Sequence, residues 1–287
     1  DRPFVIAPRR TLQSEYRSSR VRLLDLLTAA VLSVPLLAAA AEPLPSDTIA
    51  SAIAHPARSD SDRTRDVHSR PEAVLRFLAL KPGMVVFDLL GGDGYYSEIL
   101  ARAVGPQGKV YLHNNQGYAG LMRTLPRRLQ GPDLQALEVY VREMADINLP
   151  SSSVDLVLMV MVYHDLYYLN NGWAVSPEQV FETVFRILKP GGSLAVIDHR
   201  AATGSGPSYA QNLHRIAEDF ARQDIESRGF RLDGRSEILR NPGDDLNRSV
   251  FEADLRGQTD RFLHRYRKTE APTASEAHSS TSCEIGR

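Results

Sequence analysis

Cysteine is almost absent from this chain of 287 residues, which contains only Cys283. A single cysteine excludes an internal disulfide and any metal site built from several thiolates. Cys283 lies in the polar stretch "TEAPTASEAHSSTSCEIGR", which holds too few apolar residues to form a core. We therefore predict a disordered tail over residues 271–287.

A strong charge of either sign is also missing, because 34 lysines and arginines oppose 35 aspartates and glutamates. Without a basic excess, the sequence gives no electrostatic sign of nucleic-acid binding. The chain is 43% hydrophobic and 24% charged, which is typical of a globular protein. We predict a single domain with an N-terminal helical extension over residues 43–270, without a nucleic-acid partner. Composition leaves the oligomeric state undefined.

The uncharged run near the start of the chain is too short for a typical membrane span. It covers residues 26–41, contains Pro35, and has 16 residues where a spanning helix needs about 20. Arginines precede this run and alanines end it, an order typical of secretory signal peptides. We predict a leader and signal peptide over residues 1–42, export to the bacterial periplasm and no stable membrane anchor. A membrane anchor and a buried helix are the alternatives.

Short apolar runs alternate with amphipathic segments through the rest of the chain. We predict strands over residues 84–90, 109–114, 137–143, 154–163 and 193–200, followed by antiparallel strands over 230–239 and 261–268. Helices are predicted over residues 71–80, 95–104, 120–130, 176–188 and 208–229. This alternation predicts an α/β fold with a doubly wound, mostly parallel seven-stranded sheet. Such sheets bind ligands at the carboxyl ends of their strands.

A glycine-rich turn follows the first predicted strand, in "VVFDLLGGDGYYSEIL" over residues 85–100. Glycines there let a ligand approach the backbone, and the helix that follows presents free N–H groups. A dinucleotide fingerprint requires glycine or alanine three residues after Gly94, where this chain has Ser97. A dinucleotide-dependent dehydrogenase is therefore the least favoured enzyme class for this chain.

Four motifs in order, over roughly residues 70–200, carry a family resemblance: "DLLGGDG", "GPQGKVYLHN", "INLPSSSVDLVLMV" and "VFRILKPGGSLAVID". The chain resembles class I S-adenosylmethionine-dependent methyltransferases, which have a Rossmann-like fold, and in particular a group of exported bacterial predicted methyltransferases. The resemblance implies S-adenosylmethionine as cofactor. It implies that the cofactor is bound by Asp88, Leu90, Gly91, Gly92, Gly94, Tyr95, Asn114 and Asp146.

This sequence departs from the family pattern at three of its positions. Leu90 replaces the first glycine of the turn. Asn114 replaces the acidic residue that accepts both ribose hydroxyls, and an amide lacks the charge that strengthens those hydrogen bonds. Asp146 is the predicted adenine-side acid, although the family's acid aligns on Ala145. We expect weaker or altered cofactor binding from the loss of charge at residue 114.

Titratable side chains follow the fourth and fifth predicted strands, at the ligand edge of the sheet. We name Tyr163, His164, Asp165 and His199 as candidate catalytic residues, since histidine titrates in the range useful for removing a proton from an acceptor. The alternative is that these residues brace the turns they occupy. His214 is a candidate lid residue or a packing residue. Asp165, Asp198 and His199 have no spacing that requires a cation, so no metal site is predicted.

The sequence therefore favours methyl transfer from S-adenosylmethionine to an unidentified small-molecule acceptor. The alternative is an exported binding protein that has kept the fold and lost transfer activity. Leu90, Asn114 and the predicted export motivate that alternative, because the methyl donor is made in the cytoplasm.

Overall fold

The computed structural model describes residues 42–269, except residues 121, 170–172 and 174. The predicted leader, apart from Glu42, and the predicted tail lie outside the described residues. Everything described belongs to one compact unit. Of the helices in this part of the chain, none is long and apolar enough to cross a membrane.

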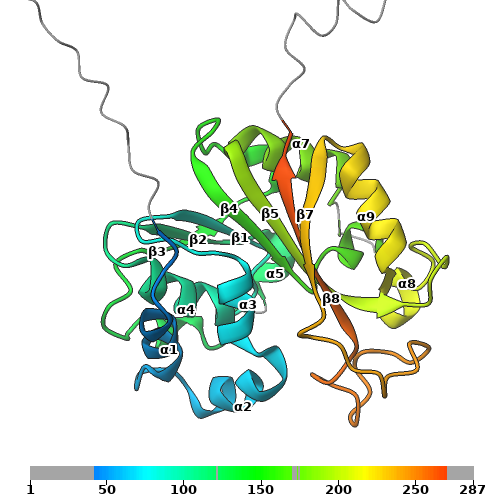
Figure 1. Ribbon diagram of the computed structural model, residues 1–287, viewed down its shortest axis with the longest axis horizontal. Helices are drawn as coiled ribbons and strands as arrows, with labels where there is room; N and C mark the ends of the chain where they lie inside the picture. The colour runs from blue at the N-terminus through cyan, green and yellow to red at the C-terminus, as the bar shows by residue number, and fades with distance from the viewer. Residues whose placement is uncertain (1–41, 121, 170–172, 174, 270–287) are drawn as a thin grey trace, which may run out of the picture. The chain divides into compact units, whose positions relative to one another are not determined.

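One twisted sheet forms the centre of the molecule (Figure 1). Its strand order is β3-β2-β1-β4-β5-β8-β7, with β6 paired only to β5. Strands β1 to β5 are parallel, whereas β8 is antiparallel to both β5 and β7. The strands are β1 Val85–Leu89, β2 Lys109–Asn114, β3 Leu137–Val141, β4 Val154–Val160, β5 Leu188–Ala201, β6 Ile216–Ala217, β7 Phe230–Ser236 and β8 Arg261–Lys268.

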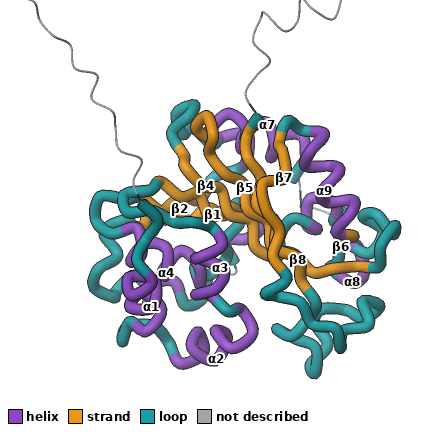
Figure 2. Tube along the Cα trace, in the orientation of Figure 1, coloured by secondary structure: helices purple, strands orange, loops and turns teal. Residues whose placement is uncertain are grey.

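Helices surround this sheet and occur mainly between successive strands (Figure 2). The α-helices are α1 Ser46–Ala54, α2 Asp60–Ser69, α3 Pro71–Phe77, α4 Tyr95–Val104, α5 Gln116–Ala119, α6 Leu125–Arg128, α7 Pro177–Ile187, α8 Ala210–Leu213 and α9 Glu218–Ser227. Two short 3₁₀ turns are η1 Met144–Asp146 and η2 His164–Tyr167. The predicted mixed, mostly parallel α/β architecture is confirmed.

Each face of the sheet is covered by its own apolar core, because strand side chains alternate between the two faces. Leu156 and Leu158 of β4 belong to the cluster that includes residues of α1, α3 and α4. Val157 and Met159 of the same strand belong to the cluster that includes residues of α7 and α9. Figure 1 shows these two groups of helices well separated around the sheet. Burial on both faces accounts for the uninterrupted apolar run of β4.

Several predicted elements agree closely with the structure. The bounds of β2, β8 and α4 are those expected from the sequence. Ser176 caps α7 by accepting a hydrogen bond from the Gln179 N–H, and Pro177 occupies the first turn. The fifth strand is longer than expected, because the "KPGG" segment extends it back to Leu188.

The long helix predicted over residues 208–229 is wrong. The chain forms α8, the two-residue strand β6 and then α9. His214 adopts a left-handed backbone conformation with φ of 53° and ends α8. The next residue, Arg215, is fully buried, and its guanidinium donates to Asp244 Oδ1 and Oδ2 at 3.0 and 2.9 Å. A pairing with a residue so distant in sequence overrides the helical periodicity of this segment.

The helix predicted over residues 120–130 is also too long. Among the described residues of this range, only Leu125–Arg128 are helical, with Pro126 in the first turn. Proline has no N–H to donate and is tolerated at a helix start, so the helix begins beside Pro126.

Candidate active site

The turn after β1 holds its shape through groups beneath it. Leu90 has φ of 53°, a left-handed conformation that costs a non-glycine residue about 1–2 kcal/mol. Its side chain is only 2% exposed and belongs to the core cluster that includes residues of α7 and α9. Its N–H donates to His113 Nδ1 at 3.4 Å. Leu90 therefore packs into the core and leaves the turn uncovered.

The two glycines after Leu90 are required for different reasons. A Cβ at Gly91 would lie 2.6 Å from Asp88 Oδ2 and 2.7 Å from Leu112 Cδ1, so only glycine fits. Gly92 has φ of 60°, and a Cβ built there meets no atom within 4 Å. The space above Gly92 is open, as a ligand that approaches the backbone requires.

Beneath this turn, Asp88 is 1% exposed and accepts a hydrogen bond from Ser97 Oγ at 2.5 Å. Burial raises the pKa of Asp88 to about 6, although the hydrogen bond from Ser97 opposes that shift. Asp88 thus joins β1 to the first turn of α4, and it does so inside the protein rather than at a ligand.

Asn114, at the end of β2, is fully buried and pairs with the backbone of Gly92. Its Oδ1 accepts from the Gly92 N–H at 2.9 Å, and its Nδ2 donates to the Gly92 carbonyl at 2.9 Å. A carboxylate could accept the first bond but could not donate the second. The amide at this position is therefore explained by the turn itself. The Asn114 amide oxygen can accept one more hydrogen bond, and its amide nitrogen can donate one more.

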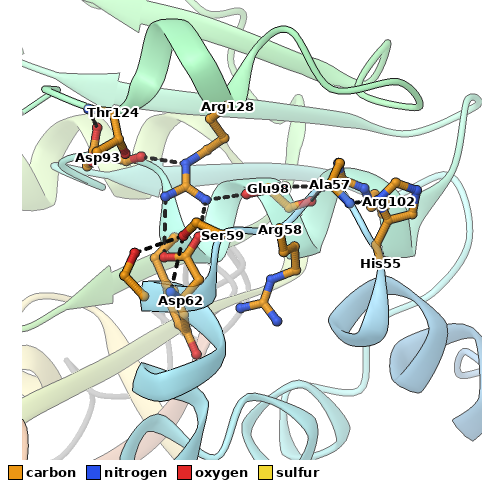
Figure 3. A network of polar contacts seen from close by, with 12 residues as sticks. His55, Ala57, Arg58, Ser59, Asp62, Asp93, Glu98, Arg102, Thr124 and Arg128 are labelled. Atoms are coloured by element: carbon orange, nitrogen blue, oxygen red, sulfur yellow. Dashed lines mark hydrogen bonds and ion pairs between the residues drawn. The ribbon is translucent and has the colours of Figure 1, made fainter.

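A buried ion-pair network holds α2 and α6 against the turn and α4 (Figure 3). Arg128 of α6 donates to Asp62 Oδ2 of α2 at 2.6 Å and also pairs with Glu98 of α4. Its Nε donates to the Asp93 carbonyl, within the turn, at 2.9 Å. Asp93 in turn accepts a hydrogen bond from the Thr124 N–H at 2.9 Å. The network fixes α2 and α6 beside the glycine turn.

A cavity of about 1040 Å³ lies at the carboxyl ends of β4 and β5. Its wall includes residues of α2, of the segment after β2, and of the segment that precedes β8. Ser69 of α2 lines it and accepts a hydrogen bond from Tyr96 Oη, at the start of α4, at 3.3 Å. Gly91, Gly92 and Gly94 are not among the lining residues. The cavity and the turn are thus linked through α2 and α4.

His164 and Asp165 line this cavity, as the sequence predicted for the end of β4. The fully buried Asp198 accepts from the His164 N–H at 2.8 Å and lies 2.8 Å from its Nδ1. Burial alone would lower the pKa of His164, but Asp198 and Asp165 raise it to about 10. Burial would raise the pKa of Asp165, but His164, His214 and Tyr118 hold it well below its usual range.

His199 and His214 line the same cavity. His199 Nδ1 lies 2.6 Å from Thr259 Oγ1. Burial, helped by the charge of His164, lowers the pKa of His199 well below its usual range, so its ring is neutral at pH 7. His214 Nδ1 lies 3.2 Å from His164 Nε2, and the two rings meet edge to face. The structure therefore brings three histidines and one carboxylate to one wall.

Three further predicted site residues do not line the cavity. Tyr163 is fully buried and donates its hydroxyl to Asp224 Oδ2 of α9 at 2.6 Å. It does not line the cavity with His164 and Asp165, and its catalytic role stays a prediction. Asp146 is exposed in η1 and does not line the cavity. Tyr95 donates to Asp66 Oδ1 at 2.6 Å and so anchors α2.

Sequence reasoning missed several cavity residues. Tyr118 and Trp173 contribute aromatic rings whose centroids are 5.3 Å apart. Arg65 and Arg261 also line the wall. Tyr118 follows the end of β2 by four residues, so the strand-end rule could have found it. No sequence pattern near Arg65 or Arg261 indicates that these residues line the cavity.

Residues 87–196 match a family described as a methyltransferase domain. Curated relatives include the ubiquinone/menaquinone biosynthesis C-methyltransferase UbiE of Hydrogenovibrio crunogenus, which is 29% identical over 125 residues, 43% of this chain and 45% of that protein. The arsenite methyltransferase of Halobacterium salinarum is 26% identical over 122 residues, 42% of this chain and 29% of that protein. The chain spans less than half the length of these relatives.

The fold is shared with solved methyltransferases. The crystal structure of a SAM-dependent methyltransferase from Aquifex aeolicus covers 74% of this chain and 100% of its own chain. The TM-score is 0.51 and the sequence identity is 24%. At that identity the likeness concerns the fold, whose ligand edge is the edge described above.

Proposed function

Since the chain carries a class I S-adenosylmethionine-dependent methyltransferase domain over residues 87–196, we propose that it transfers a methyl group to a small-molecule acceptor. The observation that carries this proposal is the convergence of His164, Asp165, His199 and His214 on one cavity at the carboxyl ends of β4 and β5. That edge is where doubly wound sheets bind their ligands. The cavity has a volume suited to small molecules.

The residues of the turn fit the cofactor in one respect and restrict it in another. The open space above Gly92 leaves room for a ligand against the backbone. The contact with the ribose would differ from that of the family's acidic residue, because both amide atoms of Asn114 are bonded to Gly92. S-adenosylmethionine, when bound, supplies an electrophilic methyl group on a sulfonium. The rest of the cofactor is left as a neutral thioether. Asn114 would offer the sugar its remaining N–H donor and oxygen lone pair.

The cavity wall supports an aromatic acceptor with an ionisable oxygen. Tyr118, Trp173 and Phe251 supply aromatic surface, and Arg65 and Arg261 supply positive charge that favours an oxyanion. His199 lines the same cavity with a neutral ring, which can accept a hydrogen bond from the acceptor's O–H. The C-methyltransferase and the arsenite methyltransferase among the relatives make hydroquinones and arsenite useful test acceptors beside simple phenols.

The test compares two glycine variants by calorimetric titration with S-adenosylhomocysteine. Gly92→Ala adds a Cβ to the open space above the turn, whereas Gly105→Ala adds one beyond the far end of α4. Both positions have positive φ, 60° and 71°, and open surroundings, so both substitutions strain the backbone. Gly105 also has ψ of −176°, a conformation that almost only glycine adopts, so Gly105→Ala carries a strain of about 1–3 kcal/mol and is a stringent control. We expect Gly92→Ala to weaken binding by at least about tenfold, or about 1.4 kcal/mol, and Gly105→Ala to leave it unchanged.

Two results would contradict the proposal. One is a wild-type protein that binds neither S-adenosylmethionine nor S-adenosylhomocysteine, which would favour a binding protein for another metabolite. The other is equal affinity in wild type and Gly92→Ala. Release of S-adenosylhomocysteine with a panel of phenols, hydroquinones and arsenite then identifies the acceptor class.

A further inference from the structure

We propose that His164, Asp165 and His214 bind a divalent transition-metal ion, with Zn²⁺ as the best-suited ion, at the wall of the cavity. The ion would contact the acceptor, so a catalytic role for the ion rests on the proposed function. Binding of the ion by these three residues is independent of that function. The three residues come from η2 and from the end of α8, segments 50 residues apart in sequence, which explains why no sequence spacing indicated this set.

The three potential ligand atoms form a nearly regular triangle. His164 Nε2 lies 3.2 Å from His214 Nδ1 and 3.2 Å from Asp165 Oδ1. His214 Nδ1 lies 3.6 Å from Asp165 Oδ1. Bonds of about 2.1 Å place neighbouring ligand atoms about 3.0 Å apart in octahedral geometry and about 3.4 Å apart in tetrahedral geometry. The triangle therefore fits three ligands on one side of an ion with little movement.

Neighbouring groups already orient two of these ligands. Asp198 lies against His164 Nδ1 at 2.8 Å, which leaves Nε2 of the same ring to face the triangle. Tyr118 donates its hydroxyl to Asp165 Oδ2, which leaves Oδ1 facing the triangle. The Trp173 indole donates to the Asp165 backbone carbonyl at 2.8 Å. A carboxylate behind a histidine ligand is the usual support of a metal site.

The third ligand is held by stacking and by the backbone. His214 packs edge to face against Phe251, with centroids 4.8 Å apart, and lies against Tyr168 at 5.0 Å. Its left-handed conformation is fixed by the neighbouring Arg215, whose guanidinium is buried on Asp244. The imidazole is thus positioned by the same long-range pairing that interrupts the predicted helix.

The chemistry of the set selects the ion. Two imidazoles and one carboxylate suit Zn²⁺ and its neighbours in the first transition row, whereas Mg²⁺ and Ca²⁺ prefer oxygen ligands alone. All three residues line the cavity, so the remaining coordination positions face the space proposed for the acceptor. An acceptor O–H bound there loses its proton to solvent. The resulting oxygen keeps its electron pair for the bond to the methyl carbon, while the C–S bond breaks with its pair on sulfur.

The test measures zinc binding apart from activity, by equilibrium dialysis and by the visible spectrum of bound Co²⁺. We use Asp165→Asn, which keeps the side-chain shape, and His214→Asn, since asparagine tolerates the left-handed conformation. His68→Ala is the matched control, because His68 lines the same cavity outside the triangle. We expect wild type and His68→Ala to bind one ion per chain, and the two triangle variants to lose at least about 100-fold in affinity.

Titration with S-adenosylhomocysteine on the same samples separates the two proposals. Retained nucleoside binding in a wild type that takes up no Zn²⁺ or Co²⁺ would overturn the metal site alone. Zinc binding with no nucleoside binding would overturn the methyltransferase function alone. Zinc affinity unchanged in folded Asp165→Asn and His214→Asn, with folding checked by circular dichroism, would place the ion elsewhere and also overturn this inference.

Discussion

The two halves of the ligand edge of the sheet differ in how their polar groups are used. At the turn after β1, Asn114 bonds both backbone groups of Gly92, and Asp88 bonds Ser97 inside the protein. At the ends of β4 and β5, by contrast, His164 and His199 present ring edges to a cavity of about 1040 Å³. The polar side chains of the first half bond only within the turn and its neighbours, whereas those of the second half also line the cavity.

This difference indicates that the turn contributes a binding surface and the cavity contributes reactive side chains. A turn whose hydrogen bonds are satisfied internally offers a ligand its surface and its N–H directions, so it can serve a common cofactor without a reactive group. Histidines and carboxylates that converge on a cavity can exchange protons or bind an ion, and they decide which acceptor reacts. We therefore expect acceptor specificity to reside around β4 and β5, and the substitutions below test that division.

The largest effect is expected from Arg215→Met, on the cavity side. Arg215 and Asp244 form an ion pair with no exposed side-chain surface, and loss of one partner leaves the other charged and buried. Such a change costs about 3–5 kcal/mol, measured as the free energy of unfolding in urea. Arg248→Met is the control, since Arg248 is 38% exposed beside Glu252 and Asp254 and solvent screens its ion pairs. Equal losses in the two variants would show that the buried pair has no special role.

A pH-dependent effect is expected on the turn side, from Asp88→Asn. The folded protein raises the pKa of Asp88 to about 6, so between pH 4 and pH 6 the unfolded chain ionises while the folded chain keeps its proton. The stability contributed by this residue therefore falls as pH rises and levels off above pH 6. The free energy of unfolding of Asp88→Asn minus that of wild type should increase by about 2 kcal/mol from pH 4 to pH 7. A difference independent of pH would show that the buried carboxyl does not titrate in this range.

Local sequence patterns predicted the turn side well, because its groups lie close together in the chain. Apolar runs, glycines and a helix start within sixteen residues were enough to place Asp88, Gly91 and Gly92 correctly relative to β1 and α4. What the pattern could not show was the partner of Asn114. The departure from the family's acid is a hydrogen-bonding requirement of Gly92, and it appears only when β1 and β2 are side by side.

The cavity side was predicted only in part, because contacts distant in sequence build it. The strand-end rule correctly brought His164, Asp165 and His199 to one wall. It could not bring in His214, since the helical periodicity of residues 208–229 hides the turn that Arg215 imposes through Asp244. Adjacency in sequence was also misleading for Tyr163, which precedes two cavity residues but does not line the cavity.

The smallest effect is expected from Tyr163→Phe. This substitution tests whether a residue that precedes His164 and Asp165 but does not line the cavity affects binding there. The substitution removes one hydrogen bond to Asp224, which keeps those from Tyr167 at 2.7 Å and Arg228 at 3.1 Å. We expect a loss of about 1 kcal/mol in the free energy of unfolding and unchanged binding of zinc and S-adenosylhomocysteine. Tyr118→Phe is the matched comparison, since it removes the hydroxyl that orients Asp165 and should weaken zinc binding about 10- to 100-fold. The outcome to look for is a Tyr163→Phe protein that folds and binds normally but releases no S-adenosylhomocysteine with an acceptor that wild type methylates. Loss of packing against Asp224 cannot account for such a result, so it would support a catalytic role for Tyr163.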